Sequence, residues 1–128
     1  MAVTALIDRY CDVWNEPDGN RRRTLLAALW APGATYTDPS VHAKDAEALL
    51  AHIAKVRAKR PGAKVLRSSE VDMHHGYARF AWRVVQADGT RLPEGLDIAF
   101  VSPEATMILR IIGFFGPLAS GAAVPAGG

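Results

Sequence analysis

The chain has 128 residues, of which 49% are hydrophobic and 22% are charged, and its formal net charge is +2. This length and composition predict one globular domain, and the small, scattered positive charge argues against a nucleic-acid-binding protein. No apolar run approaches the ~20 residues of a membrane span, and the single cysteine, Cys11, excludes an intrachain disulfide. The chain opens without a signal-peptide pattern, so we expect a cytoplasmic protein with no membrane partner.

Three helices are predicted in the first half of the chain. Residues 4–16 carry apolar side chains three and four positions apart. A second helix begins after a capping Asp18 or Asn20, and its apolar face consists of Leu25, Leu26, Leu29 and Trp30. A third helix begins near Asp45, and the Pro61-Gly62 pair ends it.

Three consecutive arginines, Arg21 to Arg23, fall near the start of the second predicted helix. Cations at this end of a helix oppose its dipole, so these residues do not serve helix stability. We interpret them as a solvated face, with contact to an anion or a partner as the alternative.

The rest of the chain is predicted to be β. A short strand at 34–38 precedes the third helix, and four strands follow it, at 64–74, 77–86, 95–101 and 107–115. This order predicts an α+β domain over residues 1–118, in which three helices lie on one side of a curved antiparallel or mixed sheet. Such an arrangement encloses a cone-shaped pocket suited to a small molecule. The Gly-, Ala- and Pro-rich residues 119–128 are predicted to be a disordered tail.

The segment from Trp30 to Pro39 is the most informative part of the chain. Apolar helical residues end at Pro32-Gly33, and the short strand that follows carries Asp38 next to a second proline. Burial disfavours an ionised carboxyl group and can make it a proton-transfer group. The alternative for Asp38 is a turn carboxylate that accepts backbone N–H bonds.

These features resemble the SnoaL-like branch of the nuclear transport factor 2-like superfamily over residues 6–118. The residues that carry the resemblance are Tyr10, the segment from Trp30 to Pro39, Gly95-Leu96-Asp97, and the segment from Ile111 to Gly116. The resemblance implies a cystatin-like fold, which hosts isomerases, cyclases, hydrolases, dehydratases and non-catalytic binders. It also implies a homodimer through the convex face of the sheet.

Ketosteroid isomerases and polyketide cyclases are the relatives that suggest residue roles. The resemblance matches Tyr10 to the oxyanion-binding tyrosine of the isomerases and Asp38 to their proton-shuttling aspartate. Their third catalytic group, a protonated aspartate, falls on Phe100, which implies the loss of a donor typically worth ~2.7–4 kcal/mol. Asp97 is a separate position, three residues earlier, that does not simply replace it. Asp97 is instead the candidate for the acid with which SnoaL-like cyclases protonate a carbonyl oxygen.

Alternation along the strands assigns side chains to two faces. Phe80 and Trp82 share the face expected to line the pocket, and Arg79 and Arg83 share the opposite, convex face. Gly113 in the last strand leaves room for a ligand or for a neighbouring backbone. The apolar residues predicted to bind the ligand are Trp14, Trp30, Phe80, Trp82, Phe100, Ile111 and Phe115.

Two histidines are candidates for the site because the imidazole titrates near neutral pH. His42 follows Asp38 in a predicted loop, where catalytic residues are common. His52 lies on the third predicted helix and can reach the pocket rim, with solvent exposure as the alternative. His74 and His75 are adjacent in extended chain and point apart, so they make a poor metal pair. We expect neither a metal nor an organic cofactor.

The sequence thus predicts a pocket protein for a flat or ring-containing apolar molecule that bears a carbonyl or hydroxyl group. In an enzyme, Asp38 would move a proton next to the carbonyl and Tyr10 would hydrogen-bond the developing oxyanion, with Asp97 and His42 as further catalytic candidates. One alternative is a non-catalytic binder, sensor or carrier that uses the same pocket. Another is a domain whose pocket is filled by side chains and that serves dimer assembly.

Overall fold

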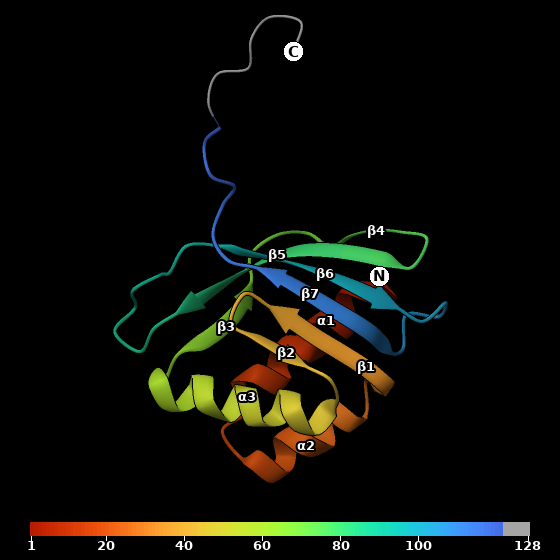
Figure 1. Cartoon of the computed structure of the whole chain (residues 1–128), viewed down its shortest axis with the longest axis horizontal. Helices are drawn as coiled ribbons and strands as arrows, with labels where there is room; N and C mark the ends of the chain where they lie inside the picture. The colour runs from red at the N-terminus through yellow and green to blue at the C-terminus, as the bar shows by residue number, and fades with distance from the viewer. Residues whose placement is uncertain (122–128) are drawn as a thin grey trace, which may run out of the picture.

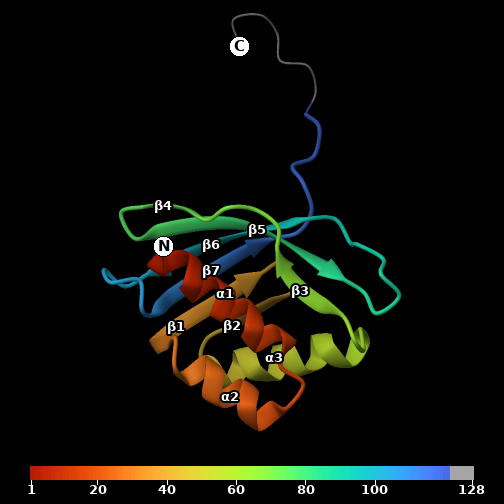
Figure 2. The ribbon, with the colours of Figure 1, turned by 180° about the vertical axis from the view of Figure 1, so that it is seen from behind.

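Three helices lie on the concave side of a strongly curved, seven-stranded sheet (Figures 1 and 2). The computed structural model describes residues 1–121. The helices are α1 (Ala2–Asn15), α2 (Gly19–Ala27) and α3 (Ala46–Lys59). The strands are β1 (Trp30–Asp38), β2 (Val41–Ala43), β3 (Lys64–Arg67), β4 (Asp72–His74), β5 (Tyr77–Val85), β6 (Gly95–Val101) and β7 (Ile108–Phe114).

The sheet is mixed. Its strands follow the order β2-β1-β7-β6-β5-β3, and β4 also pairs with β5. β1 and β7 run parallel to each other, whereas the other pairs are antiparallel. The chain passes from β1 through α3 to the far edge and returns through β5, β6 and β7, so its first and last strands meet inside the sheet. This confirms the predicted α+β fold with a cone-shaped, curved sheet.

Aspartates begin two of the helices, as the sequence predicted. Asp18 precedes α2, and its side chain accepts a hydrogen bond from the backbone N–H of Asn20 at 2.9 Å. Asp45 precedes α3 and accepts from the N–H of Ala48 at 2.8 Å. Each cap satisfies a first-turn donor that has no partner within its helix.

Polar side chains fix α1 against β3. The Asn15 side chain donates to the carbonyl oxygen of Val65 at 2.8 Å and accepts from the N–H of the same residue at 2.7 Å. Arg67 of β3 donates to Asp8 of α1 at 2.7 Å. The helix therefore lies across the edge of the sheet and closes one side of the cone.

Arg22 corrects the interpretation of the arginine run as a solvated face. It is 7% exposed, and its guanidinium donates to the carbonyl oxygens of Glu16 at 2.8 Å and Pro17 at 3.4 Å. These carbonyl groups follow the last turn of α1, where no helical backbone N–H is available to donate to them. Arg22 thus joins the end of α1 to α2, and only Arg21 and Arg23 lie on the surface, in ion pairs.

The first strand begins at Trp30, four residues before the predicted start, because α2 already ends at Ala27. Trp30 pairs with Ile108 of β7, and the register then shifts before Thr35. Gly33 lies inside this bulge with φ of 80°, a conformation that glycine adopts without a steric penalty. The bulge interrupts the alternation that would have marked the strand in the sequence.

The predicted strand at 64–74 is in fact two strands, β3 and β4, which pair with different halves of β5. Between them the hydroxyl oxygen of Ser69 accepts the N–H of Ala81 at 2.8 Å. A side chain thus takes the place of a strand carbonyl, and the ladder breaks there. The predicted loop after Asp38 contains the short strand β2, which includes His42.

Alternation assigned the faces of β5 correctly. Ala78 and Phe80 are each 1% exposed on the concave side. The helices lie on that side, so the convex face is open, and Tyr77, Leu96 and Phe114 there are 48%, 38% and 54% exposed. The homodimer through this face stays a prediction.

None of the helices within residues 1–121 is long and apolar enough to cross a membrane. Residues 119–121 of the predicted tail have no regular secondary structure. The remaining residues, 122–128, lie outside the described part of the chain.

Candidate active site

A cavity of about 590 Å³ opens between the helices and the concave face of the sheet. This volume is typical of small-molecule sites and leaves no support for a pocket filled by its own side chains. α1 and α3 supply one wall, and the sheet supplies the other. Apolar side chains dominate, and the polar or ionisable groups of the lining are Tyr10, Cys11, Tyr36, Asp38, Ser40, His52, Lys59, Arg60 and Asp97.

Asp38 lies at the end of β1, 8% exposed, with its carboxylate in the cavity lining. The hydroxyl of Tyr36 donates to its Oδ2 at 2.6 Å. The backbone N–H and the hydroxyl of Ser40 both donate to its Oδ1 at 2.7 Å. Asp38 therefore combines the two roles that the sequence left open, since it closes a turn and also faces the cavity. Three donors hold its carboxylate in one orientation.

His52 of α3 lies beside this carboxylate, with its Nε2 at 3.8 Å from Asp38 Oδ2. Its ring meets the edge of Trp14, with centroids 5.9 Å apart. Burial lowers the pKa of His52, although the charge of Asp38 opposes the shift. The imidazole is therefore neutral at pH 7. His52 lines the cavity, which agrees with the predicted position at the pocket rim and not with the alternative of solvent exposure.

Asp97 is the second carboxyl group of the cavity and is 5% exposed. The indole N–H of Trp82 donates to its Oδ1 at 2.7 Å. Burial raises the pKa of Asp97 to about 7, the Trp82 hydrogen bond opposes the shift, and the charge of Asp38 adds to it. A large fraction of the molecules therefore carries a proton on Asp97 at neutral pH, and a protonated carboxyl is a hydrogen-bond donor.

The two carboxyl groups stand on either side of Gly113. Asp97 pairs with Gly113 across β6 and β7, and Thr37, the residue before Asp38, pairs with Ile112 across β1 and β7. Two strand spacings separate the backbones of the two aspartates, about 9–10 Å. A Cβ atom at Gly113 would lie 2.6 Å from Asp97 Oδ1 and 3.5 Å from the Cβ of Asp38. The glycine thus leaves room for the Asp97 carboxyl group, rather than directly for a ligand or backbone.

Gly95 likewise leaves room for the indole of Trp82, which donates the hydrogen bond to Asp97. A Cβ atom at Gly95 would lie 2.1 Å from the Trp82 indole. The ring therefore lies flat over the glycine, and its N–H can reach Asp97. Phe115 packs edge-on against Trp82 at the mouth, with centroids 6.0 Å apart.

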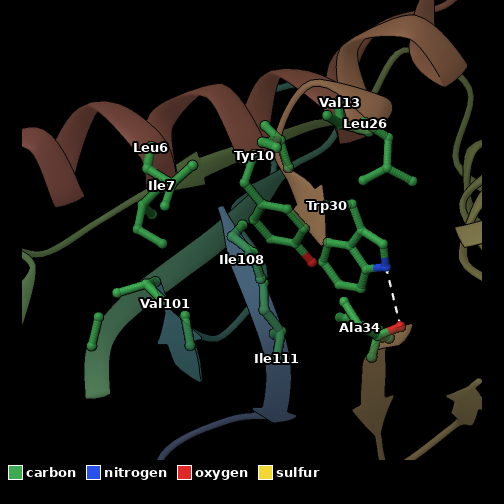
Figure 3. Packing of buried hydrophobic residues seen from close by; sticks show 14 of the residues in the cluster. Leu6, Ile7, Tyr10, Val13, Leu26, Trp30, Ala34, Val101, Ile108 and Ile111 are labelled. Atoms are coloured by element: carbon green, nitrogen blue, oxygen red, sulfur yellow. Dashed lines mark hydrogen bonds between the residues drawn. The ribbon is translucent and has the colours of Figure 1, made fainter. Parts of the chain in front are cut away.

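Tyr10 also lines the cavity, and its hydroxyl oxygen is buried. Its ring stacks on Trp30, with centroids 6.3 Å apart, in the core below α1 (Figure 3). Burial raises the pKa of Tyr10 well above its ordinary value, the charge of Asp97 adds to the shift and the side chain of Trp14 opposes it, so the hydroxyl group is protonated at neutral pH. Among the buried side chains of residues 1–121, its hydroxyl oxygen is the one polar atom without a hydrogen-bond partner.

Cys11 also reaches the cavity lining from α1. Burial raises the pKa of its thiol to about 12, so it remains protonated and contributes packing, as expected for a core cysteine. Within residues 1–121, no group of three or more His, Cys, Asp or Glu side chains could hold a metal ion.

The position of Phe100 corrects the sequence interpretation of the third catalytic group. In β6 the residues Asp97, Ala99 and Val101 are buried, whereas Phe100 points to the convex face. There it meets the edge of Tyr77, with centroids 4.9 Å apart, and the guanidinium of Arg110. Phe100 therefore cannot shape the cavity. The carboxyl group that faces Tyr10 and Asp38 from this strand is Asp97.

Three other predicted site residues do not line the cavity. Trp30 is in the core, where its indole N–H donates to the carbonyl oxygen of Ala34 at 3.2 Å (Figure 3). Ile111 is fully buried beneath it in β7. His42 is exposed on the convex side of β2, and its Nδ1 lies 2.7 Å from the hydroxyl of Thr37. It shares a face with Thr37 because the two residues are paired across β1 and β2.

The remaining predicted residues line the cavity together, namely Tyr10, Trp14, Asp38, His52, Phe80, Trp82, Asp97 and Phe115. The sequence analysis missed Tyr36 and Ser40, which hold Asp38. Tyr36 is two residues before Asp38 in the same strand, so alternation alone would have placed it on the cavity face. Lys59 and Arg60 were also missed, because they follow the apolar pattern of α3 as ordinary terminal charges.

We expect the free energy of unfolding to depend on pH through Asp97. Its pKa is about 7 in the folded protein against 3.8 for an ordinary aspartate, so between these values the native state holds a proton that the unfolded state releases. Stability is therefore lost as the pH rises from 4 to 7, by up to about 4 kcal/mol. In urea unfolding across this pH range, the unfolding free energy of Asp97→Asn should not show that loss. The exposed variant Asp72→Asn is the control and should show the same loss as the wild type. Parallel plots of unfolding free energy against pH for the wild type and Asp97→Asn would contradict the prediction.

A search of family models found no match, and a search of curated proteins found none either. Solved structures do match. A structure from Agrobacterium tumefaciens, named as an isomerase of the SnoaL-like family, is 30% identical with a TM-score of 0.82, over 88% of this chain and 96% of the other.

Two more distant structures share the fold. One from a Jannaschia species, named as a SnoaL-like polyketide cyclase, is 13% identical with a TM-score of 0.64, over 87% of this chain and 85% of the other. One from Kribbella flavida, named as a ketosteroid isomerase, is 17% identical with a TM-score of 0.63, over 96% and 84%. The identity and coverage of the Agrobacterium match, together with the cone-shaped fold, show that this chain belongs to the SnoaL-like family of nuclear transport factor 2-like proteins.

Proposed function

We propose that the protein is an enzyme that moves a proton at a carbon next to the carbonyl group of an apolar, ring-containing ligand. Asp38 is the base. Tyr10 and the protonated form of Asp97 are the donors that bind the carbonyl oxygen. No residue of this scheme depends on a metal or an organic cofactor.

The observation that carries the proposal is the Tyr10 hydroxyl. It is buried, it belongs to a residue that lines the cavity, and it has no hydrogen-bond partner within residues 1–121. Leaving a buried hydroxyl unpaired costs about 1–3 kcal/mol, and a ligand oxygen that accepts its hydrogen bond would remove this cost. Two carboxyl groups share its cavity, and one of them has a pKa of about 7. Donors and a base around one apolar space are what proton transfer next to a carbonyl needs.

In the proposed reaction, Asp38 takes a proton from the carbon next to the carbonyl. The electron pair of that C–H bond moves to the carbonyl oxygen, and the resulting enolate accepts hydrogen bonds from Tyr10 and Asp97. Asp38 then returns the proton to another carbon of the conjugated system, which isomerises the ligand. The hydrogen bonds from Tyr36 and Ser40 keep the Asp38 carboxylate aimed at the ligand during both transfers.

The apolar walls strengthen each of these interactions. Phe80, Trp82 and Val84 from β5 and Leu92 after it limit the water around the enolate oxygen. Hydrogen bonds to a developing charge are worth more in such a site than in water. The neutral His52 beside Asp38 adds no competing positive charge.

We expect Tyr10→Phe to change stability and activity in opposite directions. It removes an unpaired buried hydroxyl and keeps the ring that stacks on Trp30, so the free energy of unfolding of the empty protein should rise by about 1 kcal/mol. Proton transfer should fall by about 10²–10³-fold, because one oxyanion donor is lost. Urea unfolding measures the first effect. Incorporation of deuterium from heavy water next to the ketone of a steroid enone, followed by NMR, measures the second.

Tyr36→Phe is the matched control, because its hydroxyl is satisfied by Asp38. This variant should lose stability where Tyr10→Phe gains it. Equal exchange rates in Tyr10→Phe and the wild type would refute the role of Tyr10 as an oxyanion donor.

The second candidate function is a binder, sensor or carrier without chemistry. The three hydrogen bonds that Asp38 already accepts favour it, since a carboxylate with satisfied lone pairs can be structural. A wild-type protein that binds the enone but exchanges no protons would be such a binder.

A further inference from the structure

The cavity carries charges of opposite sign at its two ends. Asp38 and Asp97 stand at the inner end, and Lys59 and Arg60 at the end of α3 line the mouth. The side chains between them include Val56, and across the mouth lie Leu92, Pro93 and Phe115. An uncharged apolar ligand would use the inner end and the walls but would leave both cations unused.

The geometry of α3 sets the distance between the two ends. His52, Val56, Lys59 and Arg60 all line the cavity and follow one another at helical spacings of four, three and one residues. Seven to eight residues of helix span about 10–12 Å. His52 Nε2 lies 3.8 Å from Asp38, so the backbone of Lys59 and Arg60 lies this length along the helix from the residue beside the base.

The two cations have no acidic partner. Within residues 1–121, the ion pairs of the protein involve neither Lys59 nor Arg60. Arg60 makes only a long hydrogen bond, 3.4 Å, to the neutral side chain of Gln86. Glu94, the acid next to Pro93 in the sequence, instead accepts from the hydroxyl of Ser68 at 2.6 Å.

Cations at the end of a helix also interact favourably with its dipole, and this accounts for charge at these positions. It does not require their side chains to line a cavity. After burial, which is the largest cause, the charges of Lys55 and Lys59 also help to lower the pKa of His52. The charge of Lys59 therefore acts on His52, which lies beside Asp38.

A small side pocket of about 60 Å³ adjoins the mouth. Arg57 and Arg60 both line it, together with Trp14 and Val56, which also line the main cavity. One guanidinium N–H of Arg57 donates to the carbonyl oxygen of Trp14 at 2.9 Å, which holds this cation in place. Arg57 is thus committed to the backbone of α1, whereas Lys59 and Arg60 remain as the cations of the mouth without an acidic partner.

We propose that the ligand carries a carboxylate at the end opposite its carbonyl group, and that Lys59 and Arg60 bind this carboxylate at the mouth. The inference rests on the proposed function for the position of the carbonyl at the inner end. The ligand class is thus a rigid, ring-containing keto acid. Its ketone meets Tyr10 and Asp97, and its rings fill the apolar middle of the cavity.

The experiment compares 3-oxo-androst-4-ene-17β-carboxylic acid with its methyl ester, because this rigid pair differs only in a negative charge and one methyl group at the end opposite the ketone. Isothermal titration calorimetry gives the dissociation constants with the wild type and with Lys59→Gln/Arg60→Gln. The matched control is Lys44→Gln/Lys64→Gln, which changes the net charge equally at positions outside the cavity lining. Deuterium exchange next to the ketone is followed in the same samples.

The wild type and the control should bind the acid about five- to tenfold more tightly than the ester, and added salt should reduce this preference. In Lys59→Gln/Arg60→Gln the preference should vanish, while the affinity for the ester stays the same. Equal binding of acid and ester by the wild type overturns the proposal. So does a preference that survives in Lys59→Gln/Arg60→Gln, or failure of both compounds to bind. Tight, charge-dependent binding of the acid without exchange would support the keto-acid ligand and refute only the proposed proton transfer.

Discussion

Asp38→Asn should abolish proton transfer while leaving the ligand bound. The amide cannot accept the proton, so deuterium exchange next to the ketone of the steroid enone should fall by about 10²–10⁴-fold. The amide oxygen can still accept from Ser40, and the Tyr36 hydroxyl can rotate to accept from the new NH₂ group. We therefore expect the fold and the dissociation constant to change little. NMR exchange and calorimetry on one preparation measure the two quantities.

Asp72→Asn is the control for this experiment. It removes the same charge from an exposed side chain of β4 that pairs with Arg79 on the surface. Its exchange rate should equal that of the wild type. If Asp38→Asn kept most of the exchange activity, Asp38 would be only the turn carboxylate of β1, and the binder would become the better account of the protein.

Gly113→Ala should cost both stability and activity. The added methyl group would lie 2.6 Å from Asp97 Oδ1, so the carboxyl group must move away from the Trp82 N–H. Overpacking of this kind costs about 1–3 kcal/mol of unfolding free energy. Displacing one oxyanion donor should lower exchange by about 10²-fold. Urea unfolding and deuterium exchange measure the two losses.

A double-mutant cycle identifies the cause of both losses. In an Asp97→Ala background the clash is absent, so Gly113→Ala should then cost little stability. Gly19→Ala, at the start of α2 with no atom near the added methyl group, should leave both quantities unchanged. If Gly113→Ala lost the same unfolding free energy in both backgrounds, the glycine would be needed for the backbone of β7 and not to leave room for Asp97.

Local patterns were sufficient for most of the fold. The helices follow from apolar residues at helical spacing and from the caps at Asp18 and Asp45, because those signals lie within a few residues of one another. Alternation placed Phe80 and Trp82 on the concave side of β5 for the same reason. The pattern failed where a distant contact replaced a local one, as where Ser69 interrupts the ladder between β3 and β4.

The site was predicted less completely than the fold. The resemblance to the SnoaL-like family brought Tyr10 and Asp38 to one cavity, and both line it. It placed the third catalytic position on Phe100, whereas the strand alternation turns Phe100 outward and Asp97 inward. Counting alternate residues from a buried Ala99 would have removed Phe100, but the burial of Ala99 depends on how β6 pairs with its neighbours.

The sequence by itself determined the order of the helices and the long strands, the faces of β5 and the presence of an acid at the end of β1, because each depends on residues close together in the chain. The tertiary structure decided which side chains share a cavity with that acid. Asp97 reaches the cavity of Asp38 only because β7 places Gly113 between their strands. Lys59 and Arg60 reach its mouth only because α3 packs beside β1 and β2. Such neighbours depend on strand register and helix packing between residues more than twenty positions apart, and no local pattern encodes them.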